Sequence, residues 1–323
     1  VNTKQANKEP PLLTTKYCNK MALKLANLFV VVLLILAAKP FNVHSRTSKS
    51  PATSFTYFQN LEGSYKGQTP KGLQEVKHYL KAFGYYPHGS DLITDDFDDL
   101  LDTALKTYQK NYNLKVSGIL DADTIKQMKK PRCGVPDIIN GKTKNGKKTS
   151  DPPPFVALYT FFNGMPKWPS TKKNFTYSFS SSVQVVDMSV LRDVASNAFQ
   201  KWADVSGFTF AEAPNGAPSD MVIGFQRGDH GDGSPFDGPG RTVAHAFAPT
   251  DGRFHYDADE NWSTDPMYDE LDLESVAVHE IGHLLGLGHS TDPNAVMYAE
   301  IEAGTIKRDL DQDDIDGIHS LYP

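Results

Sequence analysis

Apolar residues recur three or four positions apart in two segments of the first half of the chain. The first set is Leu73, Val76, Leu80 and Phe83, and the second is Leu101, Ala104, Leu105, Tyr108 and Tyr112. This spacing places the apolar side chains on one face of a helix. Asp121 belongs to a residue type that caps helices, so a third, short helix is expected to start there. Residues 56–130 are therefore predicted to form a compact helical unit.

The pattern changes after this unit. Residues 140–154 are polar and rich in Gly and Pro, which is typical of a linker or loop and indicates a domain boundary. Three further helices and four short strands are predicted beyond it. The helices are expected at about 187–204, 269–285 and 311–321, and the strands at 208–211, 221–225, 243–248 and 254–256. This mixture indicates an α+β or α/β domain.

An apolar run of eleven residues lies at 28–38, and Lys24 precedes it. The run is too short to span a bilayer, which requires about 20 residues. A basic start, an apolar core and the small or modest residues Val43-His-Ser45 predict a secretory signal peptide at 21–45. A short membrane anchor or a buried helix is the alternative. Residues 1–20 precede the first Met and are expected to be an upstream-translated or fragmentary segment.

Composition narrows the function classes. Hydrophobic residues make up 39% of the 323 residues and charged residues 22%, as in globular proteins. The net charge of -6 argues against binding to nucleic acid or to an anionic membrane. Residues 251–323 carry 18 of the 39 acidic residues, which fits either cation sites or a solvated surface. Two cysteines exclude a disulfide-rich scaffold. We expect a secreted protein without stable membrane insertion, with glycosylation acceptors at Asn174 and Asn261.

His279 and His283 stand four residues apart in an apolar run that is predicted to be helical. Side chains at this spacing lie about 40° apart around a helix, so both imidazoles can bind one metal ion. Glu280 lies beside them and could take a proton from a water molecule at the metal. Such a short motif also arises by chance, which leaves a purely structural role for these residues open.

Gly286 and His289 extend the motif. If the helix continued, His289 would lie about 15 Å along its axis from His279 and could not bind the same ion. Glycine can adopt a positive φ, end the helix and turn the chain back. Three neutral imidazoles leave a fourth tetrahedral position for water, as a catalytic zinc site requires. We therefore predict a catalytic zinc held by His279, His283 and His289.

The motif His279-Glu-x-x-His283-x-x-Gly-x-x-His289 resembles that of the metzincin metalloproteases. Met297 follows at the place of the metzincin Met-turn, and Ser290 is similar to the matrixin branch. The segment Pro131-Arg-Cys-Gly-Val-Pro-Asp137 is similar to the matrixin cysteine switch. From about residue 58 onward the chain looks most like a matrix metalloproteinase of the plant type, which lacks a hemopexin domain.

The resemblance implies an α+β architecture. A metzincin-type catalytic domain with a twisted mixed sheet and three helices is expected at 155–323. A small helical prodomain, similar to peptidoglycan-binding domains but expected to act as an inhibitory cover, precedes it at 46–154, with the switch at 131–137. A Cys133 thiolate could fill the fourth position at the zinc and exclude water. The resemblance implies that Arg132 pairs with Asp137 in support of the switch. A lone reactive or buried thiol is the alternative for Cys133.

Two structural ion sites are also expected. Three histidines and one aspartate suit a closed tetrahedral zinc site, and the family pattern supports this set: His230, Asp232, His245 and His255. By resemblance, carboxylates and backbone carbonyls form a Ca²⁺ site: Asp237, Gly238, Gly240, Thr242, Asp257 and Glu260. A solvated acidic loop is the alternative. Matrixins often place an acidic ligand for another Ca²⁺ at the position of Arg253. Because arginine cannot bind a cation, a second Ca²⁺ site is not predicted.

The expected function is that of a secreted endopeptidase with zinc and calcium as cofactors, made as a latent zymogen. Its partners would be extended peptide segments of extracellular proteins, bound beside the strand at 243–247, and the enzyme itself is expected to be a monomer. In a plant it would act in the apoplast or cell wall. Ala299 stands where the family usually has a proline in the wall of the specificity pocket. Asp313 or Asp314 could pair with the N-terminal ammonium group that activation cleavage would create. A binding protein without activity and a peptidase for small peptides are the alternatives.

Overall fold

A computed structural model describes residues 58–87, 93–138 and 157–323, all within one compact unit, Pro51–Pro323. The expected upstream segment at 1–20 and the signal peptide at 21–45 lie outside the described residues. So does the whole linker at 140–154, including the expected boundary at 154. The described residues form two hydrophobic cores, one in residues 58–138 and one in residues 157–323. We call these two parts the helical domain and the sheet domain.

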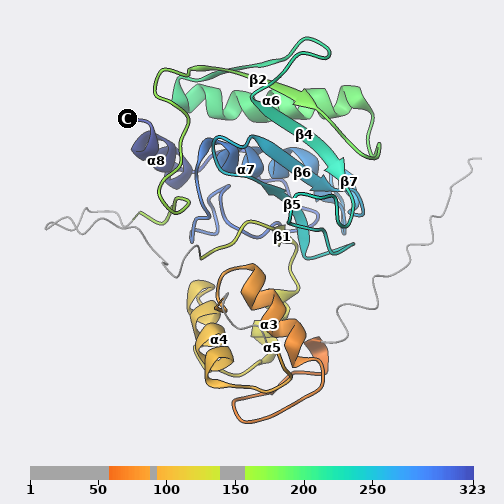
Figure 1. Cartoon of the computed structure of the whole chain (residues 1–323), viewed down its shortest axis with the longest axis vertical. Coiled ribbons are helices and arrows are strands. Elements are labelled where there is room, and N and C mark those ends of the chain that lie inside the picture. Colours follow the sequence, from red (N-terminus) through yellow and green to blue (C-terminus); the bar gives the residue numbers. More distant parts are fainter. Residues whose placement is uncertain (1–57, 88–92, 139–156) are drawn as a thin grey trace, which may run out of the picture. The chain divides into compact units, whose positions relative to one another are not determined.

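The helical domain contains α3 (Leu73–Ala82), α4 (Asp99–Asn111) and α5 (Ala122–Met128) (Figure 1). The side chains of Asp98 and Asp121 accept hydrogen bonds from backbone N–H groups in the first turns of α4 and α5. These bonds satisfy donors that a helix start leaves free. The apolar faces that the sequence predicts are buried in one core, so the predicted helical unit is confirmed.

The sheet has six strands in the order β1-β5-β6-β4-β2-β3. They are β1 (Arg132–Cys133), β2 (Asn174–Phe179), β3 (Thr209–Glu212), β4 (Met221–Gln226), β5 (Thr242–Ala246) and β6 (Arg253–Asp257). All neighbouring pairs are parallel except β5 and β6, which are antiparallel. A separate two-stranded ribbon pairs β7 (Trp262–Ser263) with β8 (Leu271–Asp272). The sheet is therefore mixed, and β1, at its edge, comes from the end of the helical domain.

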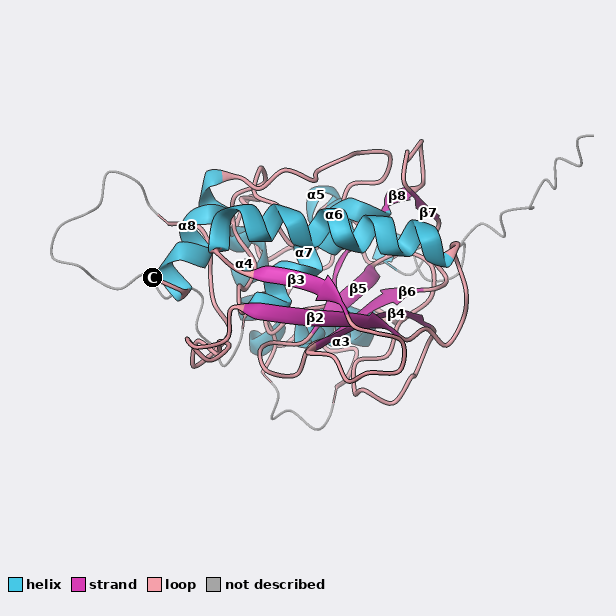
Figure 2. Cartoon of the chain, turned by 90° about the horizontal axis from the view of Figure 1, so that it is seen from above, coloured by secondary structure: helices cyan, strands magenta, loops and turns pink. Residues whose placement is uncertain are grey.

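Two long helices cover the sheet. The helices α6 (Met188–Ser206) and α7 (Leu273–Leu285) pack against each other and against the strands (Figures 1 and 2). The third helix, α8 (Gln312–Leu321), contacts α6. Trp202 is fully buried in α6, and its indole N–H donates to the backbone carbonyl of Val278, which joins the two helices. These three helices and the mixed sheet confirm the predicted α+β fold.

Several element bounds differ from the sequence prediction. The helix expected from 269 begins at Leu273, because the Asp272 side chain accepts from the backbone N–H of Ser275 and caps the helix there. The strand β2 was not predicted, although Phe175 and Tyr177 alternate toward the core. The strands β1, β7 and β8 have two residues each, too few for any periodicity to show. No helix in the described part of the chain combines the length and hydropathy needed to cross a bilayer.

Candidate metal centres

The helix α7 carries three of the predicted site residues in the interior of the sheet domain. His279, Glu280 and His283 are at most 1% exposed. The Nε2 atoms of His279 and His283 lie 3.1 Å apart, as the four-residue spacing on a helix requires. Burial lowers the pKa of both imidazoles well below the usual 6.5. Both rings are therefore neutral near pH 7, which is the form that binds metals.

Gly286 ends this helix and redirects the chain. Its φ is 107°, a left-handed conformation that an L-residue with a Cβ rarely adopts. A Cβ at this position would also lie 2.6 Å from the carbonyl oxygen of Pro166. The turn brings His289 back, with its Nε2 3.2 Å from the Nε2 of His283. The structure thus brings together the three histidines that the motif predicts.

The Nδ1 atoms of these histidines all face hydrogen-bond acceptors. The acceptors are the carbonyl oxygen of Val296 for His279 (2.7 Å), that of Leu287 for His283 (2.8 Å), and Oδ1 of Asp137 for His289 (2.8 Å). Donation from Nδ1 leaves each Nε2 with its lone pair toward the common centre. The ring orientations therefore suit metal binding. The sequence did not reveal the contact of Asp137 with His289, because these residues are 152 positions apart.

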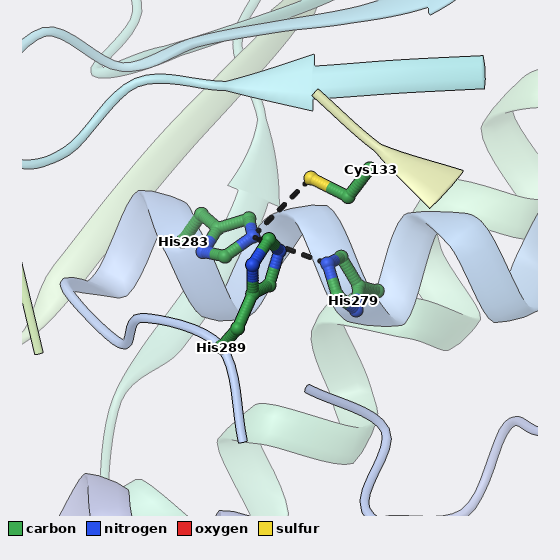
Figure 3. A group of neighbouring side chains, drawn as sticks. All are labelled: Cys133, His279, His283 and His289. Atoms are coloured by element: carbon green, nitrogen blue, oxygen red, sulfur yellow. Dashed lines mark hydrogen bonds between the residues drawn. The ribbon is translucent and has the colours of Figure 1, made fainter. Parts of the chain in front are cut away.

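Cys133 on β1 completes this cluster. Its Sγ lies 3.4 Å from Nε2 of His283, and the four ligand atoms lie within 4.8 Å of one another. Figure 3 shows the thiol and the three imidazoles pointing toward a common centre. Tetrahedral zinc, with bonds of about 2.0 Å to nitrogen and about 2.3 Å to sulfur, separates its ligands by about 3.3–3.5 Å. The nitrogen–nitrogen separations of 3.1 and 3.2 Å and the sulfur–nitrogen separation of 3.4 Å match this geometry. The residues present fit zinc.

Glu280 has the most unusual environment in this site. Its side chain is fully buried, and neither carboxylate oxygen has a hydrogen-bond partner within the described ranges. Burial raises its pKa to about 8, although the nearby Cys133 thiol acts in the opposite direction. A buried polar group without a partner is costly, and such exceptions in native proteins gather at functional sites. A group that can exchange protons near neutral pH therefore lies beside three metal-binding nitrogens.

Arg132 and Asp137 form a buried ion pair beside this cluster. Nη2 of Arg132 donates to Oδ1 of Asp137 (2.7 Å) and Nη1 donates to Oδ2 (3.1 Å). The hydroxyls of Tyr85 and Tyr112 donate to the same Oδ2 atom, and the guanidinium lies 3.5 Å from the ring centroid of Phe83. Burial opposes ionisation of Asp137, but the charge of Arg132 outweighs it, and the pKa of this carboxyl falls below its usual range. The ion pair that the resemblance implies is therefore present and buried.

The main chain of the segment 131–134 lies between two walls of the sheet domain. On one side, the backbone N–H of Arg132 donates to the carbonyl oxygen of Arg241 (2.6 Å), and that of Gly134 donates to Ala244 (2.8 Å). On the other side, the N–H of Cys133 donates to Ala299 (2.9 Å), and the N–H of Ile301 donates to Pro131 (2.9 Å). The segment is thus held as an extended strand between β5 and residues 299–301.

Met297 lies in a tight turn next to Val296, whose carbonyl oxygen accepts from His279. The carboxylate of Asp314 in α8 accepts from the backbone N–H groups of Val296 (2.8 Å) and Met297 (3.0 Å), which holds the turn in place. A Cβ on Gly282 of α7 would lie 2.2 Å from the Sδ of Met297, so only glycine allows this approach. The sequence did not reveal this role of Asp314 or the close packing at Gly282. Asp313, one of the two aspartates predicted to pair with the N-terminus of the mature enzyme, accepts from the backbone N–H of Leu158 in the uncleaved chain.

A second group of potential ligands gathers around one carboxylate oxygen. Oδ2 of Asp232 lies 2.7 Å from Nε2 of His230, 2.8 Å from Nε2 of His245 and 2.9 Å from Nδ1 of His255. His245 on β5 and His255 on β6 are brought together by the antiparallel register of these strands. Burial lowers the pKa of His245 to about 4, so this ring is neutral near pH 7. The set matches the predicted closed site of three histidines and one aspartate.

The acidic residues predicted to bind calcium lie near one another but less tightly. Burial and neighbouring acids raise the pKa of Asp257 to about 7 and of Glu260 to about 8. Oδ2 of Asp257 has no partner within the part of the chain that the structure describes. Glu260 accepts from the backbone N–H of Gly240 (2.6 Å), and Asp237 pairs with Arg241 (2.7 Å). Unlike the two histidine groups, these carboxylates do not form a compact ligand cluster among the described residues.

The remaining residues of this prediction lie in the loop before β5 or at the start of a strand. Gly238 and Gly240 have positive φ values of 80° and 86°, and Thr242 begins β5. Arg253, which stands in place of an acidic residue, forms two hydrogen bonds to Asp251 of 2.6 and 2.8 Å. The charge of Arg253 is therefore already paired with that of Asp251.

The chain is similar to known metalloproteinases over most of its length. Residues 167–323 match the family model for Matrixin, and residues 69–128 match that for a putative peptidoglycan binding domain. Metalloendoproteinase 1 of Glycine max is 47% identical over 280 residues, covering 82% of this chain and 88% of that protein. Metalloendoproteinase 2-MMP of Arabidopsis thaliana is 45% identical over 282 residues, covering 82% and 74%. Matrilysin of Homo sapiens is 39% identical over 260 residues, covering 79% and 87%.

Proposed function

The chain belongs to the matrixin family of zinc metalloendopeptidases, and from this premise we propose that it is secreted as a latent, calcium-dependent zymogen. Its substrates would be extended segments of extracellular proteins. The observation that carries the proposal is the buried Glu280 carboxylate, which has no hydrogen-bond partner among the described residues, beside three converging imidazoles. In this proposal residues 21–45 are the signal peptide, 46–154 the prodomain and 155–323 the catalytic domain. A plant protein of this kind would act in the apoplast or cell wall.

The residues of the first histidine cluster have distinct roles in the proposed reaction. His279, His283 and His289 would hold the zinc ion through their Nε2 atoms. When bound, zinc polarises the scissile carbonyl and makes a nucleophile available near neutral pH. Glu280 takes the proton from the attacking water and passes it to the leaving amine. Its pKa of about 8 in the covered site is close to the range in which a group can both accept and return a proton.

The helical domain acts as the cover that keeps this site inactive. Cys133 supplies the fourth zinc ligand and so takes the place of water. Burial, and secondarily Glu280, raise the pKa of the thiol well above its usual value, so the thiolate needs the positive charge of a metal ion. The Arg132–Asp137 pair holds the segment rigidly, and Asp137 also accepts from the ligand His289. Removal of the segment would free the fourth position.

The substrate would lie where the segment 131–134 lies. The carbonyl oxygens of Arg241, Ala244 and Ala299 and the N–H of Ile301 are all used by this segment, and its removal frees them. An extended peptide can take up the same hydrogen bonds, which give affinity without dependence on sequence. Val276 and the residues after Met297 would line the specificity pocket, and Ala299 leaves more space there than a proline.

The remaining ions would stabilise the loops around the active site. The set of His230, Asp232, His245 and His255 would hold a structural zinc, since no position is left for water. Asp237, Asp257 and Glu260 would hold Ca²⁺ together with backbone carbonyls of Gly238, Gly240 and Thr242. The support is the clustering of carboxyl groups whose pKa burial raises, because a cation would relieve the cost of ionising them. The exposed Asn174 and Asn261 would accept glycans.

Hydrolysis of an internally quenched peptide by two secreted full-length proteins tests this function. The wild type should be inactive, whereas Cys133→Ser should cleave the peptide and lose activity with 1,10-phenanthroline. Activity of both proteins would retain the protease and reject the thiol latch. Inactivity of both, even after limited proteolysis and with zinc bound, would indicate a binding protein without catalysis. Cleavage of a folded protein substrate, and not only of peptides, would distinguish an endopeptidase from a peptidase for small peptides.

A further inference from the structure

Glu300 lies in the segment after the Met-turn and contacts the helical domain through its side chain. Nζ of Lys130 lies 3.1 Å from Oε2 of Glu300, and the side-chain amide of Gln127 donates to Oε1. Only 6% of the Glu300 side chain is exposed. Both carboxylate oxygens are therefore satisfied by residues that precede the cysteine switch.

The carboxylate is placed beside the path of the covering segment. Glu300 pairs with Arg132 across a β-bridge, and its neighbours Ala299 and Ile301 form the main-chain hydrogen bonds to that segment. Lys130 precedes Cys133, the residue at the zinc, by three positions. The charged side chain of Lys130, three residues before Cys133, is thus bound by Glu300 in the wall formed by residues 299–301.

Loss of the helical domain would remove both partners of Glu300 at once. Lys307 is a cation of the sheet domain on which Glu300 acts electrostatically. Its Nζ already donates to the carbonyl oxygen of Pro293 (2.7 Å) and lies 5.5 Å from the ring centroid of Tyr298. The carboxylate is then open to a new cationic partner, because a hydrogen bond between two charged groups is stronger than one between neutral groups.

We propose that Glu300 is a specificity-determining residue of the mature enzyme, which binds a Lys or Arg side chain of the substrate where Lys130 binds in the zymogen. This inference rests on the proposed endopeptidase function. Lys130 is three positions from Cys133, the residue at the zinc, so the basic substrate residue would lie two to four positions from the cleaved bond. Its side chain would point toward residues 299–301. In the zymogen, Lys130 imitates that substrate side chain.

The test uses the full-length chain, activated by limited proteolysis, as wild type and as Glu300→Gln. The matched control is Glu302→Gln, an exposed acidic residue two positions further along the same segment. Each protein is assayed with quenched peptides that carry Lys, norleucine or Glu at each of four positions on either side of the cleaved bond. Thermal unfolding confirms that each variant is folded.

For the wild type, kcat/KM should be about tenfold or more higher with Lys than with norleucine at one position, since a hydrogen bond to a charged group is involved. Glu300→Gln should lose this ratio because it cleaves the Lys peptide more slowly, and Glu302→Gln should keep the ratio. Equal rates with Lys and norleucine at every position in the wild type would overturn the inference, as would an unchanged ratio in Glu300→Gln. Failure to cleave any peptide would instead reject the endopeptidase function.

Discussion

Replacement of Arg132 by alanine should make the zymogen active without proteolysis. Arg132 and Asp137 are 1% and 4% exposed in their side chains, and two hydrogen bonds join them. Their burial depends on the contact with the sheet domain, because Asp137 also contacts His289 and the backbone of Arg132 contacts Arg241. When the segment leaves, water solvates Asp137. Arg132→Ala therefore leaves an uncompensated buried charge only in the latched state.

The magnitude follows from the surroundings of Asp137. Removal of one partner from a buried ion pair costs about 3–5 kcal/mol. Asp137 keeps the hydroxyls of Tyr85 and Tyr112 and the imidazole of His289, so the lower end of this range applies. A cost of about 3 kcal/mol raises the ratio of unlatched to latched protein about 100-fold, at about 1.4 kcal/mol per tenfold change.

The assay measures peptide hydrolysis by the secreted full-length protein before any activation. Each rate is divided by the rate of the same preparation after limited proteolysis, which removes differences in the active domain. Lys126→Ala is the matched control, because Lys126 is an exposed basic residue of α5. This ratio should rise about 100-fold for Arg132→Ala and stay unchanged for the control.

Two results would refute this reasoning. One is a folded Arg132→Ala zymogen that is as inactive as the wild type. The other comes from the double variant Arg132→Ala with Asp137→Ala, in which no buried charge remains unpaired. Its activity before proteolysis should not exceed that of Arg132→Ala, because replacing both partners of a buried pair costs less than removing one. Additive or greater activation would show that the pair does not act as a unit.

Three further outcomes are expected. Glu280→Gln, after activation, should lower kcat about 10²–10⁴-fold with zinc still bound, as measured by peptide hydrolysis and metal analysis. In calcium-free buffer the melting temperature should fall as pH rises from 5 to 8, because burial holds the pKa of Asp257 at about 7 and of Glu260 at about 8. The folded state then keeps protons that the unfolded chain has released, so stability is lost as pH rises toward the pKa of the folded state. An equal fall in melting temperature with Ca²⁺ present would argue against the calcium site. Gly282→Ala should lower the unfolding free energy by about 1–3 kcal/mol in denaturant titration, because its Cβ would overlap Met297, and an unchanged midpoint would contradict that packing.

Much of the active-site helix could be predicted from local sequence. The spacing of His279 and His283 determines their relative direction once the segment is helical, and Gly286 signals where the helix ends. The capping aspartates at 98, 121 and 311 similarly act within one turn of their own position. Of these caps only Asp121 was predicted, and such local contacts can be predicted because the interacting groups are covalently close and few conformations are available to them.

Contacts between distant parts of the chain needed the fold. His245 and His255 meet His230 and Asp232 only because β5 and β6 pair in one register, and their spacing alone would not reveal that meeting. The resemblance to a family supplied that set, but it did not supply the hydrogen bond between Asp137 and His289.

By itself the sequence determined the zinc-binding helix, the glycine that ends it and the mixed α+β composition, because each depends on residue spacing of a few positions. Only the tertiary structure decided which groups complete the site. It placed Asp314 at the Met-turn and Glu300 against Lys130, and it brought Cys133, which the sequence had already suggested, next to the histidines. These contacts join residues 17 to 170 positions apart, and their geometry depends on strand register and helix packing, which no local pattern encodes.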